Sequence, residues 1–60
     1  MTNIDIVQML ANGHKVHEIA KEYGTTKYYV AKKINEIRTR CNCTTYGHLI
    51  AVYFRKKLID

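Results

Sequence analysis

The sequence predicts an all-α domain, and three observations support this fold class. Apolar residues recur at helical spacing in four successive segments of the 60-residue chain. Between the second and third segments stands a Gly-Thr-Thr break, so that the stretch from Lys15 to Arg40 has the outline of a helix, a tight turn and a helix. The chain contains no Pro and only three Gly, a composition that argues against disorder.

Size and charge limit the partners that the chain can have. A domain of this length buries only ~60% of its unfolded surface, so oligomerisation is a plausible source of stability. Ten Lys and Arg against five Asp and Glu give a net charge of +5. This excess favours an anionic partner, which could be nucleic acid or an acidic membrane surface.

The N-terminal segment shows no targeting signal. It lacks a basic region and carries Asp5 within its apolar part, unlike a signal peptide. No apolar run approaches the ~20 residues that a membrane span requires. Cys41 and Cys43 are therefore expected to be free thiols, and we expect a cytoplasmic protein.

The first helix is expected over residues 3–12. Thr2 or Asn3 can cap it, because both side chains accept hydrogen bonds from free backbone N–H groups in the first turn. The Asn12-Gly13 pair ends it, since Gly tolerates the left-handed conformation. Its apolar face comprises Ile6, Val7, Leu10 and Ala11.

The second helix is expected over residues 15–23. Gly24 ends it, and Thr25 or Thr26 supplies the hydroxyl that caps the third helix. Both signals fall within three residues, which predicts a sharp turn. Its apolar stripe comprises Val16, Ile19, Ala20 and Tyr23.

The third helix, expected over residues 26–40, carries a polar and basic outer face. At 100° per residue, one narrow arc faces the core and comprises Val30, Ile34, Ile37 and Cys41. Opposite this arc lie Tyr28, Lys32, Asn35 and Thr39, with Ala31 at the margin. Five of the ten basic residues belong to this helix, with Glu36 as its single acid. Such a face is typical either of a major-groove reader or of an ordinary solvated helix.

The fourth helix, expected over residues 45–57, has more apolar width than a small core can cover. Thr44 or Thr45 can cap it. One stripe comprises Tyr46, Leu49, Ile50, Tyr53 and Leu58. A second uncharged strip comprises Gly47, Ala51, Phe54 and Leu58, and it predicts a dimer interface through which two copies associate. Alternatively, this helix packs only on its own core, with Phe54 half exposed.

The segment GHKVHEIAKEYGTTKYYVAKKINEIRTR resembles the LuxR/GerE-type (NarL-like) helix-turn-helix family. The similarity extends without gaps through the first and fourth helices and covers essentially the whole chain. The residues that match the family pattern outright are Gly13, Glu18, Ile19, Ala20, Gly24, Thr26 and Val30. The resemblance implies a four-helix LuxR/GerE-like helix-turn-helix domain, a stand-alone regulator whose third helix reads DNA and whose fourth forms a homodimer.

The family's base-contacting positions correspond to Ala31, Lys32 and Asn35. Helical geometry independently places Lys32 and Asn35 on the outward face. Ala31 and Lys33 stand where the family usually has Lys and His, so the family's operator sequence cannot be transferred.

We therefore expect a sequence-specific transcriptional regulator that binds double-stranded DNA and associates with the nucleoid when bound. Expected base contacts are Tyr28, Ala31, Lys32 and Asn35. Expected phosphate contacts are Lys15, Thr26, Lys27, Tyr29, Lys33, Arg38 and Arg40. Tyr28 and Tyr29 could equally be surface tyrosines that cover the turn. The alternative is an interaction module that binds another regulator or RNA polymerase through the fourth helix without reading DNA.

Other chemistries have less support in the sequence. Cys41, Cys43 and His48 could be metal ligands, but structural zinc usually requires four ligands, and no second pair of such residues follows. Arg40 could lower the pKa of a nearby thiol and make it reactive. The five tyrosines leave open a single-strand stacking surface, although no sheet is expected to carry it. There is no phosphate loop or nucleophile-base pair, so no enzyme, cofactor or metal site is expected.

Overall fold

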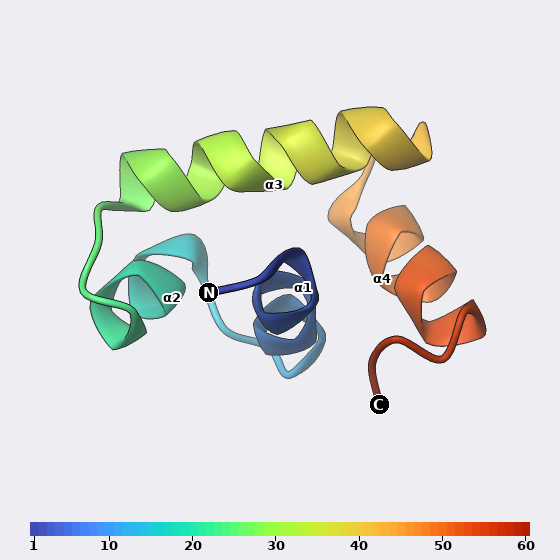
Figure 1. Ribbon diagram of the computed structural model, residues 1–60, viewed down its shortest axis with the longest axis horizontal. Coiled ribbons are helices and arrows are strands. Elements are labelled where there is room, and N and C mark those ends of the chain that lie inside the picture. Colours follow the sequence, from blue (N-terminus) through green and yellow to red (C-terminus); the bar gives the residue numbers. More distant parts are fainter.

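The computed structural model describes residues 1–60 and contains four helices and no strands, which confirms the all-α class (Figure 1). The helices are α1 (Asn3–Ala11), α2 (Val16–Glu22), α3 (Lys27–Cys41) and α4 (Tyr46–Arg55). All four were predicted, and their ends differ from the expected ones by at most two residues. None of them combines the length and apolar character needed to cross a membrane.

Threonine hydroxyls cap three of the four helices. Thr2 accepts from the backbone N–H of Asp5 at 3.1 Å, and the Asp5 carboxylate accepts in return from the Thr2 backbone at 2.9 Å. Thr26 caps α3 by accepting from Tyr29 N–H at 3.1 Å. Thr45 caps α4 in the same way. The structure thus selects one residue from each pair of candidate caps.

The turn between α2 and α3 is tight, as predicted. Gly24 adopts a left-handed conformation with φ of 65°, which suits a residue without a Cβ. The next residue, Thr25, donates its backbone N–H back to Ala20 O at 2.9 Å and closes the end of α2. Four residues therefore separate α2 from α3.

Every helix contributes to one small core. Its members are Ile6, Val7, Ile19, Ala20, Val30, Ile34, Ile37, Cys43, Leu49, Tyr53 and Ile59. Of the four inward residues expected for α3, Val30, Ile34 and Ile37 are buried, and Cys41 packs half-buried against the core. This burial confirms the predicted orientation of α3 about its axis.

Three positions of the predicted apolar stripes are exposed. Tyr23 lies beyond the last turn of α2 and is exposed, because the chain has already turned away from the core. Tyr46 is also exposed, and the guanidinium of Arg38 lies 5.6 Å from its ring centroid. Cys41 packs against the core as predicted, although it is half-buried, and Cys43 after the α3 C-cap is buried within the core.

The third exposed stripe position, Leu58, follows an unexpected end to α4. The helix ends at Arg55 rather than at residue 57, because Lys57 adopts a left-handed conformation with φ of 59°. This reversal leaves Leu58 exposed and turns Ile59 into the core. Asp60 then donates its backbone N–H to Gln8 Oε1 of α1 at 2.9 Å. The chain after α4 thus closes over α1.

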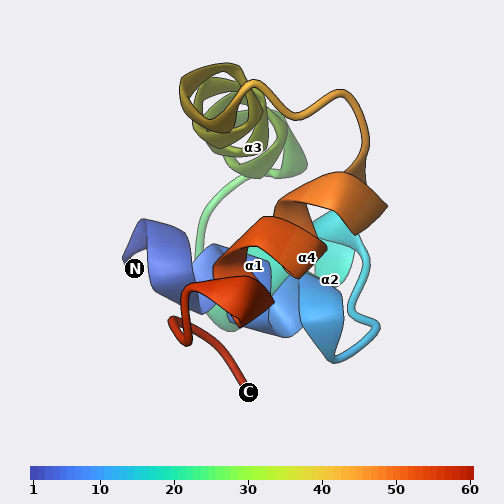
Figure 2. The ribbon, with the colours of Figure 1, turned by 90° about the vertical axis from the view of Figure 1, so that its right-hand side faces the viewer.

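The helix α3 lies along one side of the molecule. Figure 2 shows α3 nearly end-on, with α1, α2 and α4 together below it in this view. Along its length, α2 and the turn lie near its N-terminal end and α4 near its C-terminal end (Figure 1). One whole side of α3 is consequently free of other helices.

Candidate nucleic-acid interface

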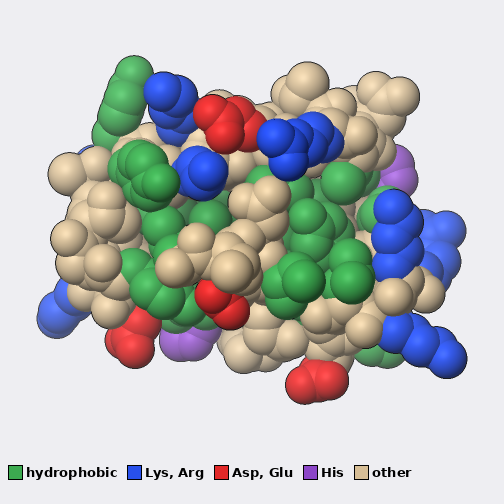
Figure 3. Space-filling view, in the orientation of Figure 1, with side chains coloured by type: hydrophobic (Ala, Val, Ile, Leu, Met, Phe, Trp, Pro, Cys, Tyr) green, Lys and Arg blue, Asp and Glu red, His purple; other side chains and the backbone are tan.

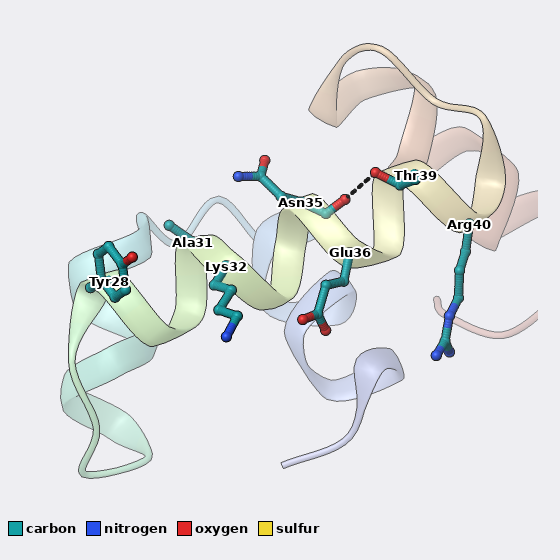
Figure 4. A pocket seen from close by; sticks show the side chains of 7 residues that line it. All are labelled: Tyr28, Ala31, Lys32, Asn35, Glu36, Thr39 and Arg40. Carbon is teal, nitrogen blue, oxygen red and sulfur yellow. Dashed lines mark hydrogen bonds between the residues drawn. The ribbon is translucent and has the colours of Figure 1, made fainter.

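The outer side of α3 carries the four residues predicted to contact bases. Tyr28, at the first turn of the helix, has 79% of its surface exposed. Lys32 and Asn35 are also exposed, and Ala31 beside them is half-buried. Together with Glu36, Thr39 and Arg40 they line an open hollow along the helix (Figure 4). The structure thus brings the predicted base-contacting residues onto one continuous surface.

Two of the residues that line this hollow, Glu36 and Thr39, were not in the predicted set. Thr39 donates its hydroxyl to the backbone carbonyl of Asn35 at 2.9 Å, so the hydroxyl is already engaged within the helix (Figure 4). Because Thr39 follows Asn35 by four residues, the sequence already predicted that the two side chains lie on the same face of the helix. Glu36 lies 3.9 Å from Lys33 Nζ, so the single acid of α3 partly neutralises one of its cations.

Positive charge is concentrated along this side of the molecule. In Figure 3, basic side chains follow the edge where Figure 1 places α3, with one acidic group among them. Of the residues expected to contact phosphate, Lys27, Tyr29 and Arg40 are exposed on α3, and Thr26 is its exposed N-cap. Lys33 is half-buried. The helix α3 is therefore the most cationic of the four helices.

Lys15 belongs to a different part of the surface, at the N-cap of α2. Its side chain is exposed, and its backbone N–H donates to the Glu18 carboxylate at 2.8 Å. This hydrogen bond from the Lys15 backbone lowers the pKa of Glu18. Lys15 can therefore contact a phosphate only where a bound molecule extends past α3 to the start of α2.

Arg38 has contacts that its predicted phosphate role did not foresee. Its Nη1 donates to the carbonyl of Thr44 at 3.0 Å, and its Nη2 donates to Oδ1 of Asn35. Its Nε is buried without a hydrogen-bond partner. The guanidinium therefore joins the outer face of α3 to the segment before α4 and is directed into the protein surface. Helical spacing could not predict this, since the contact with Thr44 depends on how the chain turns after Cys41.

The outer side of α4 is apolar and exposed. All four residues predicted for a dimer interface, Gly47, Ala51, Phe54 and Leu58, are exposed, but Leu58 follows the reversal at Lys57 and does not continue the helical line of the other three. Phe54 has 61% of its surface accessible, more than any other apolar side chain except Tyr28. The opposite side of α4 supplies Leu49 and Tyr53 to the core. This apolar strip is thus additional to what the fold itself buries.

The cysteines lie at the junction of α3 and α4 and are free thiols. Cys43 is 6% exposed, and burial raises the pKa of its thiol. Its Sγ lies 3.4 Å from the carbonyl of Cys41. No group of three or more His, Cys, Asp or Glu side chains is placed to hold a metal ion. The geometry therefore supports a packing role for Cys43.

Comparisons with protein-family models, with curated proteins and with solved structures found no match for this chain.

Proposed function

We propose that this protein is a transcriptional regulator of the LuxR/GerE type that binds double-stranded DNA sequence-specifically. The observation that carries the proposal is the outer side of α3, where Tyr28, Lys32 and Asn35 are exposed in successive turns. A helix is narrow enough to enter the ~12 Å wide major groove, and Lys and Asn are side chains that read base edges there. The tight turn holds α2 behind α3, as in a helix-turn-helix.

The phosphate contacts in this proposal come from cations beside the outer face of α3 and, for a bound molecule that extends past α3, from Lys15 at the start of α2. Lys15, Lys27, Lys33 and Arg40 are the charged members, and Thr26 and Tyr29 add hydroxyl donors at the start of α3. Four neutralised phosphates give a salt slope of about −3.6, so affinity should fall ~10²-fold between about 50 and 200 mM salt. Arg38 is left out of this set, because its guanidinium is already bound by Asn35 and Thr44.

We further propose that two copies associate through the apolar strip of α4. Gly47 and Ala51 allow close approach of a partner helix, and Phe54 and Leu58 supply apolar area. The longest Cα extent of the molecule is 29 Å, and α4 lies toward one end of it. A two-fold pair of this kind would present two α3 helices to half-sites about one turn of DNA apart, which predicts a roughly palindromic site.

A second candidate function uses the same strip for a different partner. The exposure of Phe54 also suits an interaction module that binds RNA polymerase or another regulator through α4. In that case α3 would be an ordinary solvated helix, and DNA would not be bound at all.

Fluorescence anisotropy with a labelled 20-base-pair duplex of random sequence distinguishes the two. The DNA-binding proposal expects clear binding near 50 mM salt and a loss of ~10²-fold near 200 mM. Absence of binding near 50 mM salt would eliminate DNA binding and leave the interaction module. If the protein binds DNA, selection from a duplex library over several rounds should yield a roughly palindromic site.

A further inference from the structure

Arg38 is fixed from three directions at the C-terminal half of α3. Its Nη1 donates to the Thr44 carbonyl at 3.0 Å, and its guanidinium carbon lies 5.6 Å from the centroid of the Tyr46 ring. Its Nη2 donates to Oδ1 of Asn35. A guanidinium held by the segment before α4 and by the first residue of α4 has little freedom to turn toward a ligand.

This contact determines which end of the Asn35 carboxamide faces outward. Arg has five N–H donors and no acceptor, so only the oxygen of the carboxamide can face it. The amide nitrogen is then directed away from Arg38, and in Figure 4 it points along α3 toward Ala31. Thr39 does not compete for the side chain, since its hydroxyl donates to the backbone carbonyl of Asn35. Asn35 thus presents its N–H₂ group to a ligand above Ala31.

The orientation affects base recognition because Asn normally reads adenine with both ends of its carboxamide. The oxygen must accept from adenine N6 while the nitrogen donates to N7. Here adenine N6 would approach the Asn35 oxygen next to the Arg38 N–H that already donates to that oxygen. The adenine amino group and the guanidinium both carry positively charged hydrogens, which disfavours this approach. Guanine presents only acceptors, N7 and O6, toward the same groove. The Lys32 ammonium, one helical turn before Asn35, is likewise a pure donor.

We propose that Arg38 is a positioning residue that fixes Asn35 as a hydrogen-bond donor, so that Lys32 and Asn35 together select guanine over adenine. The inference rests on the proposed binding of α3 in the major groove. It gives that surface a base preference, and it explains why an arginine on a basic helix is held along the protein surface by Asn35 and Thr44.

Selection from a duplex library with a random core, carried out with three proteins, tests the proposal. The wild type should enrich guanine at two neighbouring positions of each half-site, with a preference over adenine of about 10-fold at each. Arg38→Leu releases the Asn35 oxygen and should shift one of these positions toward adenine while the other keeps guanine. Arg55→Leu, which removes the same charge from exposed α4, is the matched control and should leave both preferences unchanged.

A purely structural role for Arg38 gives a different result. Arg38→Leu would then weaken binding to all sequences equally and leave the base preference as in the wild type, which would overturn the inference while DNA binding stands. Failure of the wild type to bind any duplex near 50 mM salt would remove the inference together with the proposed function.

A second measurement does not depend on whether Arg38→Leu folds. The guanines of the best wild-type duplex are replaced by 7-deazaguanine, which lacks the N7 acceptor but keeps the Watson–Crick pairing. Wild-type affinity should fall about 10-fold at each read position. Arg38→Lys, which keeps the charge but cannot bridge Asn35 and Thr44, should show an intermediate preference for guanine. Unchanged affinity for the 7-deazaguanine duplex would contradict the proposal.

Discussion

The outer faces of α3 and α4 are both exposed, yet they differ in chemistry. The α3 face is polar and cationic, with Tyr28 as its only large aromatic group. The α4 strip has no charge and contains Phe54, whose side chain is 61% exposed. One small core carries both faces, since the inner sides of both helices contribute to it.

This difference is the reason why we propose a different kind of partner for each face. A cationic, hydrogen-bonding face gains free energy by neutralising phosphates and by pairing with base edges. An uncharged strip gains it by burying apolar area against another protein surface. The two faces meet where Arg38 of α3 contacts Tyr46 of α4 and Thr44 before it. Variants that affect one face and spare the other can therefore test each proposal separately.

The largest effect is expected from a core substitution that unfolds the domain and so disrupts both faces. Ile34 is fully buried on the inner side of α3, and Ile34→Ala should cost about 2–5 kcal/mol of unfolding free energy. A domain of this size has little stability to spare, so we expect thermal unfolding monitored by circular dichroism to show a largely unfolded chain. Lys32→Ala, on the exposed side of the same helix, should melt like the wild type. Equal melting of the two variants would contradict the assigned core.

The next effect is confined to the α3 face. Lys32→Ala combined with Asn35→Ala should weaken binding to the selected duplex by ~10²-fold, because two base contacts of about 1–3 kcal/mol each are lost. Anisotropy titration at fixed salt measures the loss. Lys21→Ala, an exposed cation of α2 outside the proposed interface, is the control for charge. If the double variant binds as tightly as this control, the base-contacting residues are wrong.

A smaller effect should separate the α4 strip from DNA contact. Phe54→Glu places a charge in the proposed dimer interface, and sedimentation at tens of micromolar protein should show a monomer. Affinity for a palindromic duplex should fall about 10-fold, while affinity for a half-site stays the same, because linked binding is lost. Ile4→Glu, which makes the same change in charge at an exposed position of α1, is the matched control. A wild type that is already monomeric would rule out the dimer.

The smallest effect concerns helix capping and should leave both faces unchanged. Hydrogen bonds from the Thr2 backbone and the Lys15 backbone lower the pKa of Asp5 and of Glu18, respectively. A carboxyl group whose pKa is lower in the folded chain than in the unfolded chain stabilises the fold at pH values above its unfolded pKa. This stabilisation is lost as pH falls through the folded pKa. Melting temperature should therefore decrease below about pH 4. Glu18→Gln should reduce that decrease, whereas Glu22→Gln, whose side chain caps no helix, should change it less.

Local sequence signals predicted the first three helices well. Threonine caps, Gly24 and the inward spacing of Val30, Ile34 and Ile37 depend on interactions within one or two turns, and the sequence contains them directly. The outward orientation of Lys32 and Asn35 follows from the same periodicity. These features are confirmed because little beyond the helix itself decides them.

The junctions around α4 could not be predicted in this way. The left-handed turn at Lys57 is made without glycine, and it is accompanied by burial of Ile59 and by the contact of Asp60 with α1. The bridge from Arg38 to Thr44 likewise joins residues whose approach depends on the turn at Asn42. Such contacts arise from tertiary packing, and spacing along a single helix does not contain them.

The proposal that the outer side of α3 meets DNA can be tested by titrating ¹⁵N-labelled protein with a selected duplex and following the amide chemical shifts. We expect the largest changes at Tyr28, Ala31, Lys32, Asn35 and Arg40, and small changes in the outer strip of α4 in the DNA-bound half-site complex. Changes concentrated at Gly47, Ala51 and Phe54, with α3 unaffected, would contradict it.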